Sequence, residues 1–268
     1  MRIDITYPLH KGMFKYPSDP EAEIGQKKAE IVRTTQEIWG ENTKIGYCEV
    51  EKYGSGYGEL KLRNHHGTHI DAPAHKLPDG RTIDSYPIDK FVNSCALLQL
   101  NYGAGILGRS DRKIRPEDLG PNFYLEQIAS ENPRALILYT GFCDEMQERE
   151  GKFSDDSKNK EKEEFEKTFP YLTTEATRYI MDKFPDLQVL GIDSFAVDKK
   201  GSNSEVHRKL FSKDILVLET LVNLKILSNE LLDRKKRDPS RGKKFLLYSV
   251  PINIFGGDAA QVRAYAEI

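Results

Sequence analysis

The chain has 268 residues, 31% of them charged, and a formal net charge of −2. This length corresponds to one large domain or two small ones, and it suffices to bury a core without disulfides or structural metals. The balanced charge excludes a general basic field for nucleic acid, and no apolar stretch reaches the roughly 18 residues that a membrane span needs. We therefore expect neither nucleic acid nor a membrane as a partner.

Neither the N-terminal residues nor the cysteines of the chain are typical of a secreted protein. The N-terminal residues MRIDITYPLHKG lack the apolar core of a signal peptide. Cys48, Cys95 and Cys143 are too few and too scattered for a disulfide framework or a zinc ribbon, and an odd count suits a reducing compartment. We expect a cytoplasmic protein.

Short apolar runs that are typical of strands recur along the chain. In chain order they are Lys44–Val50, Glu59–Arg63, Ser94–Leu100, Ala135–Thr140, Leu187–Ile192, Ile215–Leu218 and Phe245–Val250. Helical spacing predicts one helix between Thr173 and Pro185 and another after Ser204, whereas Lys27–Ile38 fits either a helix or a strand. This mixture predicts one α/β domain over residues 1–268.

Two segments carry an unusual density of charge. Asp144–Lys167 holds ten acidic and six basic residues with few apolar ones, which is typical of a solvated insertion, either a charged helix or a flap. Arg234–Lys244 holds seven basic residues and one acidic residue. Because no aromatic residue is interleaved, an exposed loop between two elements is favoured over a phosphate or nucleic-acid site.

The histidines are strongly clustered. Four of the six lie within residues 65–75, in the run HHGTHIDAPAH, which also contains Asp71. Gly67 permits a turn with positive φ and Pro73 stiffens the chain, so we expect a structured loop or the end of a strand. Imidazole nitrogens and a carboxylate that converge on one point are what a divalent transition metal requires. The cluster therefore predicts a metal site.

This run resembles the pattern H-x-G-T-H-x-D-x-P-x-H of the cyclase / kynurenine formamidase superfamily of metal-dependent hydrolases, which includes isatin hydrolases. The resemblance extends to MRIDITYPLHKGMFKYPSDP at the N-terminus, to TGFCDEM, PYLTTEA and LGIDSFAVD, and to GDAAQVRAYAEI at the C-terminus. It implies a single compact domain of the swivelling α/β/β type, usually assembled into homodimers or homotetramers.

The resemblance also implies a centre for one or two divalent ions, with zinc preferred and manganese as the alternative. The implied ligands are His65, His69, Asp71, His207 and Glu219. Among these, Asp71 and Glu219 look like carboxylates that both ions can share. His75 matches the residue that takes up and returns a proton.

Substrate contacts are implied for two further residues. Tyr16 stands where formamidases place an aromatic residue, usually Trp, and Phe195 stands in GIDSFAVD where relatives usually carry Pro. The implied reaction is hydrolysis of a carbon–nitrogen bond in a small aryl amide, as in the N-formylkynurenine formamidase of tryptophan catabolism. An isatin-type lactam hydrolase and a polyketide-cyclase-like enzyme are the alternatives.

Three other interpretations use the same residues. His69, Asp71 and His207 also satisfy the two-histidine, one-carboxylate pattern of non-haem iron oxygenases, which leaves the other candidate ligands unused. Cys143 can be a nucleophile or a packing residue beside a strand. A non-catalytic metal-binding or regulatory protein on the same scaffold would be expected to have lost a ligand or His75.

Overall fold

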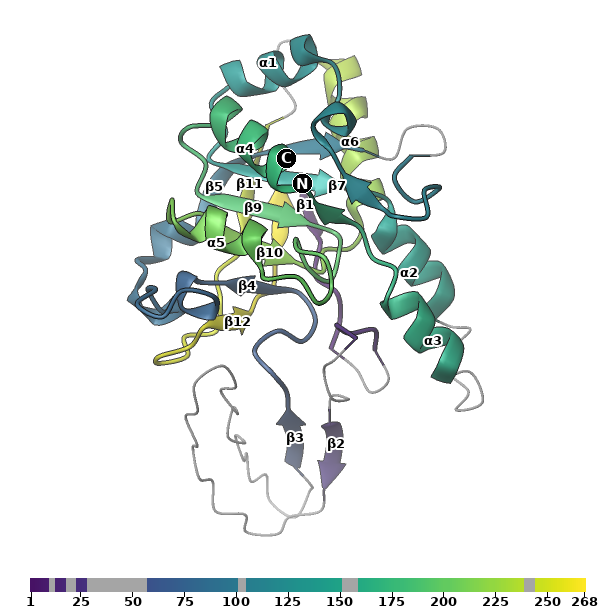
Figure 1. The fold of residues 1–268 in the computed structure, drawn as a ribbon, viewed down its shortest axis with the longest axis vertical. Helices are drawn as coiled ribbons and strands as arrows, with labels where there is room; N and C mark the ends of the chain where they lie inside the picture. Colours follow the sequence, from purple (N-terminus) through teal and green to yellow (C-terminus); the bar gives the residue numbers. More distant parts are fainter. Residues whose placement is uncertain (10–12, 18–22, 28–56, 101–104, 151–158, 239–243) are drawn as a thin grey trace.

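A mixed β-sheet organises the chain in the computed structural model (Figure 1). The structure describes residues 1–9, 13–17, 23–27, 57–100, 105–150, 159–238 and 244–268. The strands of the main sheet are β1 (Arg2–Asp4), β4 (His69–Asp71), β5 (Val92–Gln99), β7 (Ala135–Tyr139), β9 (Val189–Ile192), β10 (Leu216–Glu219), β11 (Phe245–Tyr248), β12 (Ala259–Gln261) and β13 (Tyr265–Glu267).

The strand order within this described part of the chain is β1-β13-β11-β5-β7-β9-β10-β4-β12. The central strands β5, β7, β9 and β10 run parallel, and the strands on both sides pair antiparallel. Two smaller sheets pair β2 (Glu23–Lys27) with β3 (Tyr57–Lys61), and β6 (Lys113–Ile114) with β8 (Tyr171–Leu172).

The side chains of the central strands alternate between two apolar clusters, one on each face of the sheet. In β7, Ala135, Ile137 and Tyr139 belong to one cluster, and Leu136 and Leu138 belong to the other. All five residues are buried, as continuous apolar runs indicate for parallel strands covered on both faces. The expected mixed α/β class is confirmed.

Helices cover both faces of the sheet. They are α1 (Asn122–Ser130), α2 (Phe142–Glu150), α3 (Asn159–Glu166), α4 (Thr174–Lys183), α5 (Glu205–Phe211) and α6 (Leu224–Arg237). Ile180 of α4 and Leu210 of α5 pack in the same cluster as Leu136. Leu227 of α6 packs on the opposite face, in the cluster of Ile137. Short 3-10 helices at Pro73–His75, Ile83–Ser85, Ile88–Phe91 and Pro116–Leu119 complete the elements.

The predicted strands within the described residues agree with the structure to within two residues at each end. Lys44–Val50 lies outside the described residues, as does Lys27–Ile38 beyond Lys27, the last residue of β2. The predicted helix after Thr173 is α4, and the Thr173 hydroxyl accepts the Ala176 N–H at 3.1 Å. We did not predict α1 or α6 from the sequence; in α6 the exposed Ile226 and Leu232 add apolar residues outside the buried face.

The predicted helix after Ser204 is α5, but Ser204 does not cap it. Ser204 adopts a left-handed conformation with φ +54° and its side chain makes no capping bond. Instead, the Asp198 carboxylate accepts the backbone N–H groups of Val206 at 3.0 Å and His207 at 2.9 Å. An acidic group at this end of a helix is favoured by the partial positive charge of the unpaired N–H groups.

The expectation of a solvated insertion at Asp144–Lys167 is only partly correct. The segment contributes most of α2 and all of α3, which lie beside the main sheet in Figure 1. Met146 and Phe165 are buried because these apolar residues face the core, and two charged residues of the segment, Lys162 and Glu166, are buried as well. Residues 151–158 lie outside the described residues.

We expected the basic run Arg234–Lys244 to be an exposed loop, but its first residues are helical. Arg234–Arg237 form the last turn of α6, where the partial negative charge of a helix C-terminus favours cations. Residues 239–243 lie outside the described residues.

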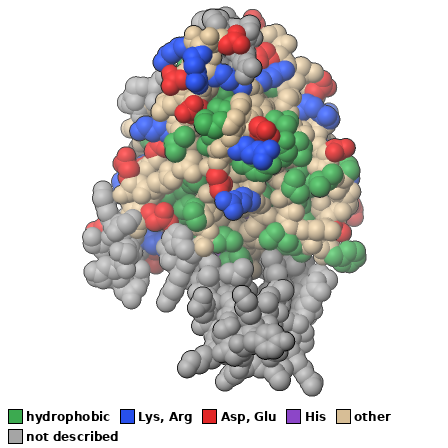
Figure 2. All heavy atoms as spheres, turned by 180° about the vertical axis from the view of Figure 1, so that it is seen from behind, with side chains coloured by type: hydrophobic (Ala, Val, Ile, Leu, Met, Phe, Trp, Pro, Cys, Tyr) green, Lys and Arg blue, Asp and Glu red, His purple; other side chains and the backbone are tan. Residues whose placement is uncertain are grey.

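The surface charge is mixed in sign. On the face drawn in Figure 2, blue and red side chains are interspersed with apolar ones over the described part. Among the described residues, we find no helix that combines the length and the apolar character needed to cross a membrane.

Candidate metal centre and its pocket

Strand register places three of the candidate ligands side by side. In the antiparallel pair of β4 and β10, His69 is the direct partner of Glu219. Side chains of directly opposed residues leave the sheet on the same face, and residues two apart on one strand share that face. His69, Glu219 and Asp71 are therefore brought together by the backbone pairing alone.

The entry into β4 is fixed by the residues that precede it. Gly67 has φ +67°, and a Cβ atom there would lie 2.6 Å from a methyl carbon of Leu9. The Thr68 hydroxyl accepts the Tyr7 N–H at 2.7 Å and donates to the Thr220 carbonyl at 2.7 Å. Gly67 and Thr68 therefore hold the residues that precede β4 against the N-terminal segment and the end of β10.

Two histidines present their Nε2 atoms to the shared carboxylates. The Nδ1 atom of His69 lies 3.0 Å from the Gly67 carbonyl, and that of His207 lies 2.6 Å from Asp198. Because a carbonyl and a carboxylate can only accept, each Nδ1 carries a proton, and the neutral ring would then offer the Nε2 lone pair to an ion. This arrangement orients a histidine for metal binding.

The distances between ligand atoms suit bound ions. The Nε2 atom of His69 lies 3.3 Å from Asp71 Oδ1 and 3.4 Å from Glu219 Oε2. The Nε2 atom of His207 lies 3.3 Å from Asp71 Oδ2 and 3.3 Å from Glu219 Oε1. Ligands that lie about 2.1 Å from a tetrahedral ion are about 3.4 Å from one another. Each histidine thus faces one oxygen of each carboxylate, with the separation that a shared ion requires.

Unsatisfied polar atoms point to the same place. His69 Nε2 and Asp71 Oδ1 are buried and make no hydrogen bond of adequate geometry within the described part of the chain. Leaving such an atom unpaired costs about 1–3 kcal/mol. A cation between them would satisfy both, so the residues present fit a divalent metal.

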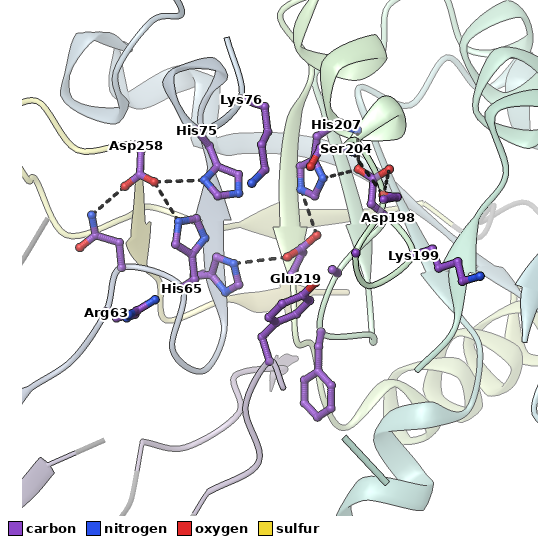
Figure 3. A pocket seen from close by; sticks show the side chains of 17 residues that line it. Arg63, His65, His75, Lys76, Asp198, Lys199, Ser204, His207, Glu219 and Asp258 are labelled. Carbon is purple, nitrogen blue, oxygen red and sulfur yellow. Dashed lines mark hydrogen bonds and ion pairs between the residues drawn. The ribbon is translucent and has the colours of Figure 1, made fainter. Parts of the chain in front are cut away.

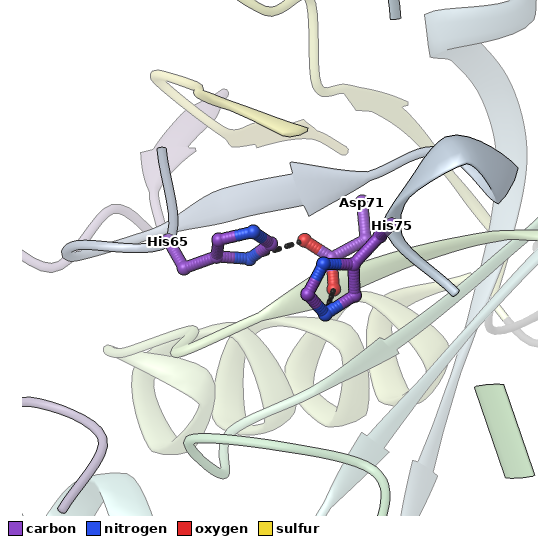
Figure 4. Close-up of side chains that lie close together, drawn as sticks. All are labelled: His65, Asp71 and His75. Atoms are coloured by element: carbon purple, nitrogen blue, oxygen red, sulfur yellow. Dashed lines mark ion pairs between the residues drawn. The ribbon is translucent and has the colours of Figure 1, made fainter. Parts of the chain in front are cut away.

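A second group lies on the solvent side of Asp71. The rings of His65 and His75 flank the Asp71 carboxylate (Figure 4), with His65 Nδ1 2.9 Å from Oδ1 and His75 Nε2 4.0 Å from Oδ2. The same two rings also contact Asp258, whose Oδ2 lies 3.0 Å from His65 Nε2 and 3.1 Å from His75 Nδ1. His65, Asp71 and His75 therefore form a second set of potential ligands that shares Asp71 with the first.

The carboxylates control the protonation of these histidines. Burial lowers the pKa of His69, but Asp71 and Glu219 outweigh it and hold that pKa well above its usual value. Burial likewise lowers the pKa of His65, and Asp71 and Asp258 raise it to about 9. For His75, burial and the neighbouring His65 dominate and lower the pKa to about 4.

The pKa values of the carboxyl groups of Asp71 and Glu219 shift in the opposite direction, downward. Burial by itself raises the pKa of Asp71, but the adjacent His65 and His69 hold it well below its usual value. The pKa of Glu219 is lowered against the same burial effect by the adjacent His207 and His69. The buried carboxylates thus remain ionised and draw positive charge into the cluster, which a metal ion can supply in place of protons.

A cavity of about 330 Å³ opens onto this cluster (Figure 3). His65, His69, His75, His207 and Glu219 form one wall. Part of the lining is aromatic, because Tyr16 and Phe195 line the cavity and both pack against Phe169, with ring centroids 5.7 and 6.0 Å away. Every site residue that the sequence indicated lies at this cavity or, for Asp71, directly beneath it.

Sequence reasoning missed two carboxylates of the site. Asp198 holds His207, and Asp258 bonds to both His65 and His75 while accepting the Asn64 side-chain N–H at 2.9 Å. Asp198 lies within the quoted run LGIDSFAVD, nine residues before His207, and was a recognisable candidate. Asp258 also lies in a quoted run, GDAAQVRAYAEI, but it is 193 residues from His65, so no local spacing links it to the histidine cluster.

Comparison with known proteins identifies related sequences. The putative cyclase family matches residues 3–199. A kynurenine formamidase from Salinibacter ruber is 27% identical over 208 residues, which is 77% of each chain. A kynurenine formamidase from Bacillus mycoides is 24% identical over 263 residues, covering 98% of this chain and 95% of the relative.

Solved structures share the fold. An isatin hydrolase A from Ralstonia solanacearum aligns with a TM-score of 0.63 at 16% identity, over 99% of this chain and 91% of that one. A potential metal-dependent hydrolase with cyclase activity aligns with a TM-score of 0.60 at 20% identity, over 99% and 96% of the two chains. At these identities the likeness concerns the fold.

Proposed function

The chain belongs to the putative cyclase family, and on that premise we propose that it is a metal-dependent hydrolase that cleaves the carbon–nitrogen bond of a small amide. The observation that carries the proposal is the paired geometry of His69 and His207, each of which faces one oxygen of Asp71 and one of Glu219 at 3.3–3.4 Å. Relatives named as kynurenine formamidases and fold neighbours named as hydrolases support it.

The metal that the site would hold is a divalent ion, with zinc first and manganese as the alternative, because imidazole nitrogens and carboxylates suit both. His69, His207, Asp71 and Glu219 would hold it, with His65 on the side of the cavity. Such an ion supplies hydroxide at neutral pH and polarises a carbonyl group.

His75 is suited to proton transfer beside that centre. Its Nδ1 atom donates to Asp258, which fixes the ring and leaves the Nε2 lone pair on the side of Asp71. His75 also lines the cavity, so a bound amide lies within reach of its ring. In the reaction, water adds its oxygen to the carbonyl carbon, the carbon–nitrogen bond breaks, and the proton passes through His75 to the departing nitrogen.

The aromatic side of the cavity favours an aryl substrate. Tyr16 and Phe195 line the same cavity as the cluster, and ring contacts contribute about 0.5–1.5 kcal/mol beyond area burial. N-formylkynurenine is the leading candidate, in keeping with the relatives' names, and an isatin-like lactam is the second, in keeping with the fold neighbours.

The experiment compares kcat/KM for N-formylkynurenine, isatin and an aliphatic formamide in protein loaded with Zn²⁺ or Mn²⁺. We expect the aryl substrates to be preferred, and Tyr16→Ala to reduce this preference about 2- to 12-fold, which is the ring-contact energy expressed as a rate ratio. Tyr16→Phe, which keeps the ring, is the matched control. Equal kcat/KM values for all three substrates, or no effect of Tyr16→Ala on the preference, would contradict the proposed aryl specificity. Absence of turnover with either ion would contradict the proposed hydrolase activity.

Assembly into homodimers or homotetramers is a further part of this proposal. Ile252 and Phe255, in the connection between β11 and β12, expose 58% and 76% of their surface, and Val250 beside them is 39% exposed. Neighbouring exposed apolar side chains often mark an interface. Light scattering should show an oligomer for the natural chain and a smaller species for Phe255→Asp.

A further inference from the structure

The Asp258 carboxylate divides its two oxygens among three side chains. Its Oδ2 atom lies 3.0 Å from His65 Nε2 and 3.1 Å from His75 Nδ1, so both rings converge on one oxygen (Figure 3). Its Oδ1 atom accepts a hydrogen bond from the side-chain amide of Asn64 at 2.9 Å. A candidate metal ligand and the candidate proton-transfer residue therefore depend on the orientation of the same carboxylate.

The main chain fixes the place of Asp258 but leaves its carboxylate free to turn. The Asp258 carbonyl accepts the Ala72 N–H at 2.9 Å, and the next residue, Ala259, is the direct partner of Asp71 in the pairing of β12 with β4. These contacts hold the backbone, whereas rotation about the Cβ–Cγ bond of an aspartate is broad. Besides the two histidine rings, Asn64 is the only described residue whose side chain bonds to this carboxylate.

Asn64 makes this bond at the expense of its own amide oxygen. The side chain is buried, and because an ionised carboxylate can only accept, the atom that faces Asp258 is the amide nitrogen. The amide oxygen is also buried, and it makes no hydrogen bond within the described part of the chain. A buried oxygen without a partner destabilises a fold. Stability alone therefore does not account for asparagine here, because a leucine of similar size would avoid the unpaired oxygen.

We propose that Asn64 is a positioning residue of this site, whose amide holds the plane of the Asp258 carboxylate so that one oxygen meets the His65 and His75 rings together. The inference rests on the proposed function, because it concerns the histidine that would transfer the proton there. With Asp258 in this orientation, a neutral His75 ring carries its proton on Nδ1 and directs Nε2 toward Asp71. Without the Asn64 bond the carboxylate can turn, and the His75 ring loses its single tautomer.

The first test measures kcat and KM for formanilide in Zn²⁺-loaded protein, with Tm to show that each variant is folded. We expect Asn64→Leu to lower kcat about tenfold, the lower end of the usual effect of losing an outer hydrogen-bond partner in a metal site, and to change KM by less than about twofold. Asn93→Leu is the matched control and should retain kcat. Asn93 is also buried, donates its amide to the Lys90 carbonyl at 2.8 Å and leaves its oxygen without a described partner, but it does not line the cavity.

A double-mutant comparison distinguishes positioning of His75 from a general effect on the fold. Asn64→Leu should lower kcat about tenfold in the natural chain and have no further effect in the His75→Ala variant. An equal reduction in both backgrounds would show that Asn64 does not act through His75 and would overturn the proposal. Asn64→Ala, which removes the same donor without adding bulk, should give the same result, so the comparison does not depend on one variant folding.

NMR of the Zn²⁺-loaded protein, labelled with ¹⁵N-histidine, provides a readout that does not depend on turnover. We expect His75, assigned by comparison with His75→Gln, to carry its proton on Nδ1 in the natural chain and in Asn93→Leu, and to show both tautomers in Asn64→Leu. In an active enzyme, an unchanged tautomer or an unchanged kcat in Asn64→Leu would overturn the proposal and leave the hydrolase intact. A tautomer that depends on Asn64 in protein that hydrolyses no amide would contradict the hydrolase and retain the positioning role.

Discussion

The Nδ1 atom of His207 lies 2.6 Å from the Asp198 carboxylate, which also accepts the backbone N–H groups of Val206 and His207. One side chain therefore both begins α5 and turns the His207 ring toward Asp71 and Glu219. The hydrogen bond to His207 lowers the pKa of Asp198 against the opposing effect of burial. Asp198 is thus an ionised partner that fixes the orientation of a candidate ligand.

Asp198→Asn should weaken metal binding. Loss of an outer carboxylate that orients a ligating histidine typically reduces metal affinity 10- to 100-fold. Titration of Zn²⁺ against a chromophoric chelator measures this change. Asp186→Asn, which alters an exposed hydrogen bond to Asn132, is the matched control and should bind zinc as the natural chain does. Equal affinities in the two variants would show that Asp198 does not act through His207.

His75→Ala should separate binding from chemistry. We expect the variant to retain most of its metal while kcat falls by about 10²–10⁴, which is the usual contribution of general acid–base catalysis. Metal content and kcat are measured on the same preparation. His75 also belongs to a possible ligand group with His65 and Asp71, so loss of metal in parallel with loss of activity would identify it as a ligand instead.

The charged insertion should support the aromatic side of the cavity. Glu166 is buried in α3, accepts the Lys15 backbone N–H at 3.3 Å, and lies 3.7 and 3.9 Å from the ammonium groups of Lys15 and Lys162. Lys15 directly precedes Tyr16, so this contact helps to place the Tyr16 ring, which lines the cavity.

Glu166→Gln should therefore lower Tm and raise KM for an aryl formamide more than for an aliphatic one. Removing one member of a buried ion pair can cost 3–5 kcal/mol, and because both ammonium groups keep some exposure we expect ~1–2 kcal/mol, or about 2–8 °C in Tm. Glu163→Gln, on the exposed side of the same helix, is the control. A fall in Tm with equal KM changes for both substrates would mean that Glu166 only stabilises the fold.

Cys143 should be dispensable for catalysis. It is buried at the start of α2, and burial together with the neighbouring Asp193 and Asp144 raises the pKa of its thiol well above the usual value. The reactive thiolate is therefore disfavoured. Cys143→Ser should retain kcat within a few-fold, and iodoacetamide should not inactivate the natural enzyme through this residue. A loss of kcat by several orders of magnitude in Cys143→Ser would instead support Cys143 as the catalytic nucleophile.

Local features of the sequence predicted much of the site. His65, His69, Asp71 and His75 lie within one short run, where glycine and proline restrict the chain enough to indicate a shaped loop. Apolar runs marked the central strands because those strands are buried on both faces. The opposition of His69 and Glu219, by contrast, depends on the register of β4 against β10, which no spacing along the chain encodes.

The residues that escaped prediction act over long separations or through the backbone. Asp258 reaches His65 and His75 only because β12 pairs with β4 at the end of the sheet. Glu166 is one of ten acidic residues in its segment, and nothing in the composition distinguishes the one that faces inward. A charge-rich sequence indicates exposure on average, whereas burial of a single carboxylate is decided by packing.

The most direct test of the metal centre is the metal content of the purified protein, measured by elemental analysis after loading with Zn²⁺ and removal of the excess. We predict one or two ions per chain in the natural protein and a marked loss in both His69→Ala and His207→Ala. His66→Asn, in which the amide oxygen can still accept the Arg63 N–H, should keep the full content because His66 lies in the same loop but outside the cluster. Unchanged metal content in both His69→Ala and His207→Ala would contradict the assignment of this site as a metal centre.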